Sequence, residues 1–180
     1  QNPLVWNGNA GRAARFHSAE LAKQAYFAHN SKCTVVSNIS TLYPSTCDGS
    51  ASCACVGGTA TCSPSPSCQT TPSGRMSLFG AGTYNGEIIA GGYTTVDDAF
   101  YGWLWEPSST SACAFTSENG HRWLILKATG ALGAGYVSVT GSPWVRYYTG
   151  DFAGPNSPIP KIPSGVHYPQ QSSSIDFWAN

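Results

Sequence analysis

The sequence predicts an α+β domain in which helices are packed against an antiparallel sheet. Before Gly130, apolar residues recur at steps of three or four, which is the period of helices. After Gly130 the period changes to two, which is the period of strands. Helices that precede a sheet in this way are typical of α+β domains. The 180 residues fit a single domain, 1–180, with enough chain to bury a core.

The first predicted helix covers residues 8–29. Asn9 can cap this helix, and steps of three or four residues give it one narrow face of mostly small side chains. Such a face allows the helix to lie close against a sheet. Residues 34–43 can hold a short strand or an extended loop, and there is room for a helical turn at 73–79.

Two further helices are expected in the second half of the chain. One covers residues 95–106, because Thr94 and Thr95 each precede an aspartate by three residues, the spacing of a capping box. Pro107 ends this helix. The other is shorter, begins near Ser117 and carries His121 on a partly apolar face.

The strands are expected near the C-terminus. Two stretches rich in β-branched and aromatic residues, 132–140 and 144–149, are joined by a Gly-Ser-Pro sequence that favours a hairpin. Residues 152–168 are rich in proline and form a surface connection. Residues 174–178 supply a last strand.

Charge and hydropathy exclude several functional classes. Lys+Arg and Asp+Glu number 9 each, so the formal net charge is zero, and only 10% of residues are charged. A nucleic-acid binder or a polybasic membrane-surface protein needs clustered cations, which this chain lacks. No run of 18 apolar residues occurs, so we expect no transmembrane segment.

Seven cysteines indicate an oxidising compartment. Five of them lie between Cys47 and Cys68, separated by Ser, Thr, Gly and Pro. The Cys53-Ala54-Cys55 spacing is too tight for a structural zinc site, and no histidine lies nearby, so disulfides are the favoured interpretation over metal ligation or free thiols. An odd count leaves one thiol free or paired outside the chain. We predict a Cys-rich surface insertion at about 44–72 in a secreted or otherwise extracytoplasmic protein.

Two glutamates are candidates for a functional site, because the chain has only nine carboxylates. Glu106 continues an apolar stripe in the last turn of its helix, where a negative charge opposes the helix dipole and calls for a partner. Glu87 lies in an apolar stretch bracketed by glycines that can form the floor of a cleft. The alternative is that each side chain is simply exposed to water. Glu106 would then extend past Pro107 into solvent, and Glu87 would lie in a solvated turn.

The four histidines differ in what they indicate. His121 lies in the first turn of a helix, where the dipole favours the neutral imidazole that binds metals. Its alternative is a hydrogen-bonded core histidine. His29 stands at the end of the first helix. His17, on the small-residue face, is interpreted as a core histidine, and His167 carries no clear signal.

Five motifs in a fixed order resemble one family. They are YFAHNSKC at 26–33, GEIIA at 86–90, WxxE at 103–106, GHRxxIL at 120–126 and LGAGY at 132–136. Together with LVWN at 4–7 and RAARFH at 12–17, they resemble the CAP superfamily of SCP-like domains. This group includes cysteine-rich secretory proteins, insect venom antigens and plant pathogenesis-related proteins of class 1. The resemblance spans residues 4–156.

The resemblance implies a three-layer α-β-α sandwich with a central antiparallel sheet. It also implies a shallow cavity lined by His29, Glu87, Glu106 and His121. The sequence departs from the family pattern in two places. First, the residues that follow the second site histidine differ from the family's eukaryotic signature, and the chain has the bacterial form GHR instead. Second, a signature that the family carries further along the chain, with a cysteine and a tyrosine, is only partly present here, and its cysteine is missing. The insertion at 44–72 lies outside the family pattern.

The expected function is that of a secreted binding module with no established turnover. Two imidazoles with carboxylates suit a divalent metal such as zinc, with the glutamates bound through water or acting from outside the ligand set. One alternative is a metal-assisted, peptidase-like hydrolase in which Glu87 or Glu106 is the general base. Another is lipid or sterol binding. The ligand itself, a small molecule, a lipid or a protein, is not specified by the sequence.

Overall fold

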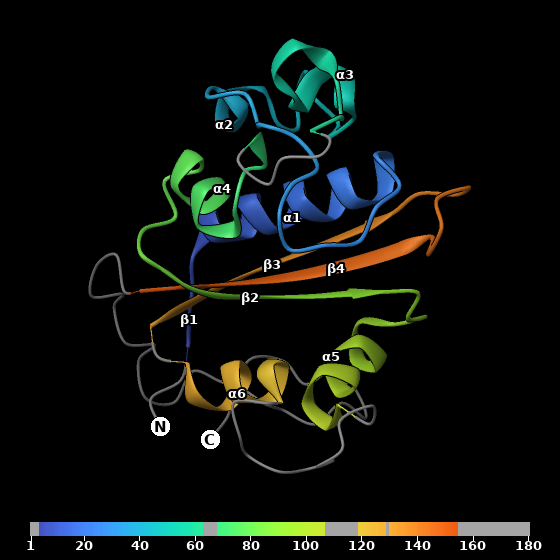
Figure 1. The fold of residues 1–180 in the computed structure, drawn as a ribbon. Helices are drawn as coiled ribbons and strands as arrows, with labels where there is room; N and C mark the ends of the chain where they lie inside the picture. Colours follow the sequence, from blue (N-terminus) through green and yellow to red (C-terminus); the bar gives the residue numbers. More distant parts are fainter. Residues whose placement is uncertain (1–3, 63–67, 107–118, 129, 155–180) are drawn as a thin grey trace.

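The structure is a computed structural model that describes residues 4–62, 68–106, 119–128 and 130–154. The described chain forms a four-stranded mixed sheet with helices on both faces, which confirms the α+β class (Figure 1). The strands are β1 (Val5–Trp6), β2 (Tyr84–Gly91), β3 (Ala131–Ser138) and β4 (Arg146–Ala153). The helices are α1 (Gly8–Lys23), α2 (Ile39–Leu42), α3 (Ala51–Ala54), the 3-10 turn η1 (Val56–Gly58), α4 (Pro72–Leu78), α5 (Val96–Trp105) and α6 (Gly120–Lys127).

The strand order is β1-β3-β4-β2, so β2 is an edge strand. The expected hairpin is present as the antiparallel pair β3 and β4, and β2 also runs antiparallel to β4. The expectation of a purely antiparallel sheet was wrong, because Val5 and Trp6 pair in parallel with Ala131 and Leu132. β4 continues to Ala153, into a stretch expected to be a connection. The expected strand at 174–178 lies outside the described residues.

Helix α1 is shorter than the sequence pattern predicted. Asn7, rather than Asn9, caps it, and its side chain accepts hydrogen bonds from the backbone N–H groups of Asn9 and Ala10. The helix ends at Lys23 instead of continuing to residue 29. The next residues turn back because Ala25 adopts a left-handed backbone conformation (φ 52°), which cannot continue a right-handed helix. His29 is therefore positioned by this turn and not by the helix.

The small-residue face of α1 lies directly on β3. Gly133 and Gly135 of this strand face the helix, and a β-carbon on either would overlap the backbone of α1 near Gly11 and Ala14. The prediction that small side chains allow close packing on the sheet is confirmed. The sheet and helix are held at a separation that only glycine on the strand permits.

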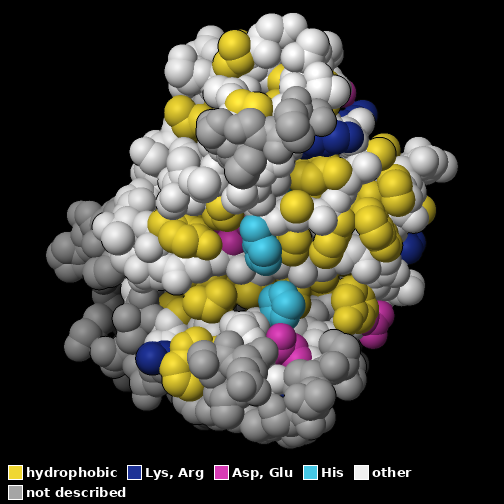
Figure 2. Space-filling model, in the orientation of Figure 1, with side chains coloured by type: hydrophobic (Ala, Val, Ile, Leu, Met, Phe, Trp, Pro, Cys, Tyr) yellow, Lys and Arg dark blue, Asp and Glu magenta, His cyan; other side chains and the backbone are white. Residues whose placement is uncertain are grey.

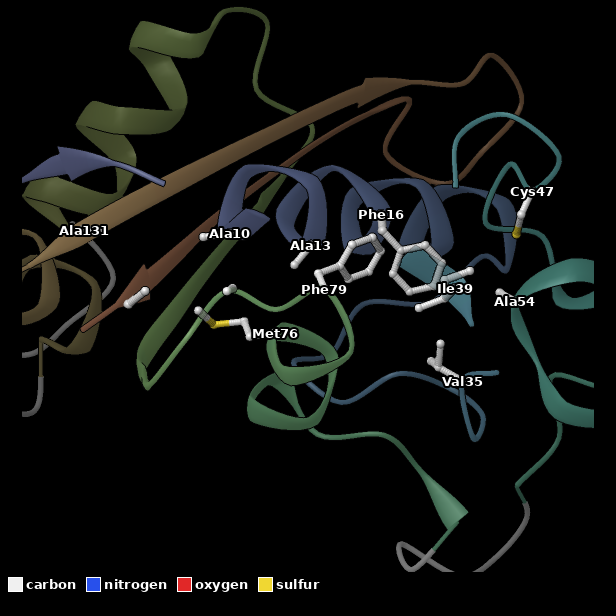
Figure 3. Close-up of a cluster of buried hydrophobic side chains, with 12 residues drawn as sticks. Ala10, Ala13, Phe16, Val35, Ile39, Cys47, Ala54, Met76, Phe79 and Ala131 are labelled. Atoms are coloured by element: carbon white, nitrogen blue, oxygen red, sulfur yellow. The ribbon is translucent and has the colours of Figure 1, made fainter. Parts of the chain in front are cut away.

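The main hydrophobic core is built around α1 and extends from the sheet residues Ala131 and Ala153 to the short helices α2, α3 and α4 (Figure 3). Phe16 of α1 packs edge-on against Tyr43 and in a tilted arrangement against Phe79, with ring centroids 5.5 and 5.6 Å apart. In Figure 3, Met76 and Ile39 lie beside the rings of Phe16 and Phe79. The buried members of the cluster are Ala10, Ala13, Phe16, Val35, Ile39, Cys47, Ala54, Met76, Phe79, Ala81, Ala131 and Ala153.

Three disulfides are present in the described residues, as the cysteine pattern predicted. They join Cys33 to Cys55, Cys47 to Cys53 and Cys62 to Cys68, with Cα–Cα distances of 5.5, 5.3 and 5.7 Å. Cys113 lies outside the described residues. Cys47, Ala54 and Cys55 are buried, so the segment at 44–72 contributes to the core beside α1. Its description as an insertion in a single domain stays a prediction. No helix among the described residues is long and apolar enough to cross a membrane.

Helices α4, α5 and α6 largely follow the sequence, whereas α2 lies in the stretch 34–43, which was expected to be a short strand or an extended loop. α4 covers the turn expected at 73–79. In α5 the capping box uses Thr95, whose side chain accepts from the N–H of Asp98 while the Asp98 side chain accepts from the N–H of Thr95. α6 begins at Gly120, and the expected start near Ser117 and the expected stop at Pro107 lie outside the described residues.

Candidate functional site

His29 and Glu87 form the first of two imidazole–carboxylate pairs. Glu87 lies on β2, and its side chain is fully buried beneath the half-exposed imidazole of His29. The Nδ1 atom of His29 lies 2.9 Å from Oε1 of Glu87. The second carboxylate oxygen, Oε2, accepts a hydrogen bond from Arg75. Both oxygens of Glu87 are thus engaged, and the pair holds the His29 ring over the edge of the sheet.

Glu87 belongs to a network of buried charges beneath α1. Arg75 of α4 lies between Glu87 and Glu20, 3.8 Å from Oε1 of Glu20, and donates to the hydroxyl of Ser31. Burial alone would raise the pKa of Glu87, but His17, Arg75 and the hydrogen bond from His29 lower it to about 2. Burial likewise opposes the charge of Arg75, yet Glu87 and Glu20 raise its pKa. The side chain of Glu87 is therefore an anion at neutral pH.

His17 is a core histidine, as the sequence predicted. It is fully buried, and its Nδ1 lies 2.6 Å from Oε1 of Glu20. Its Nε2 lies 3.1 Å from the carbonyl oxygen of Ala28 and 3.7 Å from Oε1 of Glu87. His17 thus ties α1 both to the turn that carries His29 and to Glu87. It positions the first pair and presents no free edge to solvent.

Asp151 is a buried acid that lies opposite Glu87 in the sheet. The two residues are register partners on β4 and β2, and Asp151 is 0% exposed. Within the described residues, neither oxygen of Asp151 has a hydrogen-bond partner at normal distance. Burial and the neighbouring charge of Glu87 raise the pKa of Asp151 well above its usual value. Asp151 therefore holds its proton more strongly than a free carboxyl group does, next to the ionised Glu87.

Asp151→Asn should remove a pH-dependent penalty on folding. A group whose pKa is raised by folding binds more protons in the folded state, so stability falls as pH rises from about 4 through the folded-state pKa. Asparagine is neutral at every pH and keeps the shape. Urea unfolding should show equal stability near pH 4 and a growing advantage of the variant as pH rises, roughly 1.4 kcal/mol for each unit by which folding raises the pKa. A variant that becomes progressively less stable than wild type at higher pH would contradict this assignment.

The second pair joins Glu106 to His121 across the junction of α5 and α6. Glu106 follows α5 in a left-handed conformation (φ 39°), which turns its side chain toward the start of α6. There Oε1 lies 2.7 Å from Nδ1 of His121, and Oε2 accepts the N–H of Arg122 at 3.1 Å. The N-terminal end of a helix favours a negative charge. The sequence expectation that Glu106 needs a partner is confirmed, and the partners are an imidazole and a helix terminus.

Arg122 completes this junction from the other side. Its guanidinium donates to the carbonyl oxygens of Leu104 and Trp105, at the C-terminal end of α5. The last carbonyl oxygens and the first N–H groups of a helix have no hydrogen-bond partners within the helix. Arg122 therefore donates to carbonyl oxygens at the end of α5, while Glu106 accepts from an N–H group at the start of α6. The His121 side chain, 35% exposed, is thereby fixed in orientation.

The two pairs lie on opposite sides of the edge strand β2. Glu87 faces α1 and α4, whereas the preceding residue, Gly86, lies on the other face of the strand and faces Leu124 of α6. Figure 2 shows two histidine side chains near each other on one face of the molecule, with acidic side chains beside them. His29 belongs to the first pair and His121 to the second. The fold thus brings all four predicted residues to one region, as two pairs.

The arrangement limits what the four residues can do chemically. Among the residues that the structure describes, no group of three or more His, Cys, Asp or Glu side chains is placed to hold a metal ion. The carboxylates of Glu87 and Glu106 already accept hydrogen bonds through both oxygens, an arrangement that suits a role in orienting the two imidazoles. The Nε2 atoms of His29 and His121 have no hydrogen-bond partner within the described chain. These two nitrogens are the free ligand atoms of the site.

Sequence reasoning missed most of the supporting residues. Glu20, Arg75, Asp151 and Arg122 surround the two pairs, and only Arg122 was noted from the sequence, as part of the GHR motif. The scarcity of carboxylates, which pointed to Glu87 and Glu106, applies equally to Glu20 in α1 and to Asp151 in a strand. No sequence signal distinguished Arg75.

Comparisons of the chain with protein-family models, with curated proteins and with solved structures found no match. The relation to the CAP superfamily therefore depends on the motifs of the sequence alone.

Proposed function

We propose that this chain is a secreted CAP-type binding module whose His29 and His121 side chains bind one divalent metal ion through Nε2. The observation that carries the proposal is the bond from each Nδ1 to a carboxylate. In metal sites, the second ring nitrogen of a histidine ligand is typically held by a carboxylate, which fixes the tautomer and raises the basicity of the ligating nitrogen. Glu87 and Glu106 have this role here, at 2.9 and 2.7 Å.

Other features support an extracytoplasmic, CAP-like protein. Disulfides persist in oxidising compartments, and six of the seven cysteines are paired in the described chain. Helices α1 and α4 cover one face of the sheet and α5 and α6 the other, an arrangement compatible with the proposed three-layer sandwich. Two protein ligands leave coordination positions open, which suits binding of a further ligand at the metal.

Calorimetric titration with Zn²⁺ tests the proposal. Wild type should bind zinc, and His29→Ala and His121→Ala should each abolish measurable binding because one imidazole alone is a weak ligand. Glu106→Gln keeps an acceptor for His121 but removes the charge, and should weaken binding about 10- to 100-fold. Binding should weaken in acid, since metal ligands must be deprotonated.

His167→Ala serves as the matched control and should bind zinc like wild type. Circular dichroism of each variant checks that it is folded. Zinc affinity that is the same in wild type, His29→Ala and His121→Ala would refute the site.

A further inference from the structure

A cavity lies beyond the C-terminal end of β2, against α5, whose last residue Trp105 directly precedes Glu106. It is an open depression with a volume of about 470 Å³, and it lies between the turn that follows β2 and one face of α5. At a strand rise of about 3.3 Å per residue, Gly92 at its border is roughly 16 Å along the chain from Glu87. A cavity of this size is in the range of small-molecule sites. Nothing in the metal proposal uses it.

The walls of this cavity are fixed before any ligand arrives. Gly92 has a left-handed conformation (φ 84°) that turns Tyr93 back over α5. A β-carbon on Gly102 would overlap the phenol ring of Tyr93, so glycine at this position lets the ring lie against the helix. The hydroxyl of Tyr148 donates to the carbonyl oxygen of Tyr93 at 3.0 Å. Preformed walls reduce the entropy lost on binding.

The chemistry of the lining is aromatic and acidic. Three aromatic side chains, Tyr93, Tyr101 and Trp105, line the cavity, and Trp105 is 53% exposed. Asp98 is the only charged residue among those described around it. One oxygen of Asp98 accepts the N–H of Thr95 at 3.2 Å as part of the capping box, which fixes the carboxylate at the rim.

We propose that this cavity binds an organic ammonium ion of the trimethylammonium class. The faces of aromatic rings carry partial negative charge and attract cations that lack a strong hydration shell. Asp98 adds a full negative charge, which favours a cation and repels phosphate- or carboxylate-bearing ligands. A neutral sugar stacks on aromatic rings as well, but it gains nothing from the charge of Asp98. The proposal goes beyond the metal site and does not depend on it.

Choline and its neutral isostere 3,3-dimethylbutan-1-ol are the probes, because they share a shape and differ in charge. Binding is followed by tryptophan fluorescence and by calorimetry at constant ionic strength. Wild type should bind choline at least fivefold more tightly than the isostere. Trp105→Leu and Asp98→Asn should each weaken choline binding about threefold or more, the effect expected for one cation–π or ionic contact.

Matched controls separate this cavity from general surface effects. Asp97→Asn removes the neighbouring acid of the same helix turn, and Trp6→Leu removes an indole that is 58% exposed at another place on the chain. Both should bind choline like wild type. Equal affinity for choline and the isostere, or loss of choline binding in the control variants to the same extent, would overturn the proposal. Binding of N-acetylglucosamine in place of choline would overturn it as well.

Discussion

Arg75→Met is expected to destabilise the protein by about 3–5 kcal/mol at neutral pH, the cost of removing one partner from a buried ion pair. Arg75 is 1% exposed and is the cation between Glu87 and Glu20. Methionine fills much of the same volume but leaves two buried carboxylates without their counter-charge and the Ser31 hydroxyl without its donor. Urea unfolding measured at several pH values checks the prediction.

The pH dependence distinguishes lost charge from lost packing. The pKa of Glu87 is depressed to about 2 in the folded protein, so its ionic stabilisation is complete above the unfolded value near 4.5 and is lost as pH falls toward 2. The difference between wild type and Arg75→Met should therefore narrow over that interval. Arg15→Met, a matched change at an exposed position of α1, should stay within about 0.5 kcal/mol of wild type. A gap that is constant from pH 7 to pH 2 would show that the charge of Arg75 contributes nothing.

Gly133→Ala should lower the melting temperature by about 10 °C, which corresponds to about 3 kcal/mol for a domain of this size. A β-carbon at this position would overlap the backbone of Gly11 and Ala10. Backbone cannot move aside as a flexible side chain does, so α1 must shift away from β3. That shift also strains the packing of Phe16 in the core and the contact of His17 with Glu87.

Gly8→Ala is the matched control for this prediction. The same added methyl group at Gly8 would meet nothing within 4 Å. Alanine is also the better helix former, so the control should melt at or above the wild-type temperature. Differential scanning calorimetry of both variants is sufficient. If Gly133→Ala melts like wild type, α1 does not rest on β3 at the separation that the structure shows.

The proposed metal site and the aromatic cavity share no lining residue, although Glu106 directly follows Trp105 in the chain. His29 and Glu87 lie near the middle of β2, and the cavity begins just after its end at Gly92. The zinc and choline titrations use non-overlapping variants, so one site can fail without the other. Zinc binding that disappears in Trp105→Leu, for example, would indicate a common structural defect and not two independent sites.

The sequence by itself determined the local elements, because their signals are local. The capping box at Thr95 and Asp98, the short helix around Arg75 and the β3–β4 hairpin depend on residues a few positions apart. Cysteine spacing likewise predicted the disulfides. The error at the end of α1 arose because the apolar steps continue past the point where Ala25 leaves the helical conformation. The strand β2 was also missed, because its apolar stretch between glycines lacks an alternating pattern.

Only the tertiary structure decided how the four predicted site residues are used. His29, Glu87, Glu106 and His121 come from separate segments, and pairing them requires that β2 be an edge strand with α1 on one side and α6 on the other. The charge balance around Glu87 depends on Arg75 and Asp151, which reach it from α4 and β4. Such contacts are fixed by strand order and register, which local residue patterns do not encode. The electrostatics of a buried site is therefore a property of the packed chain, whereas helix caps and turns are properties of short stretches of sequence.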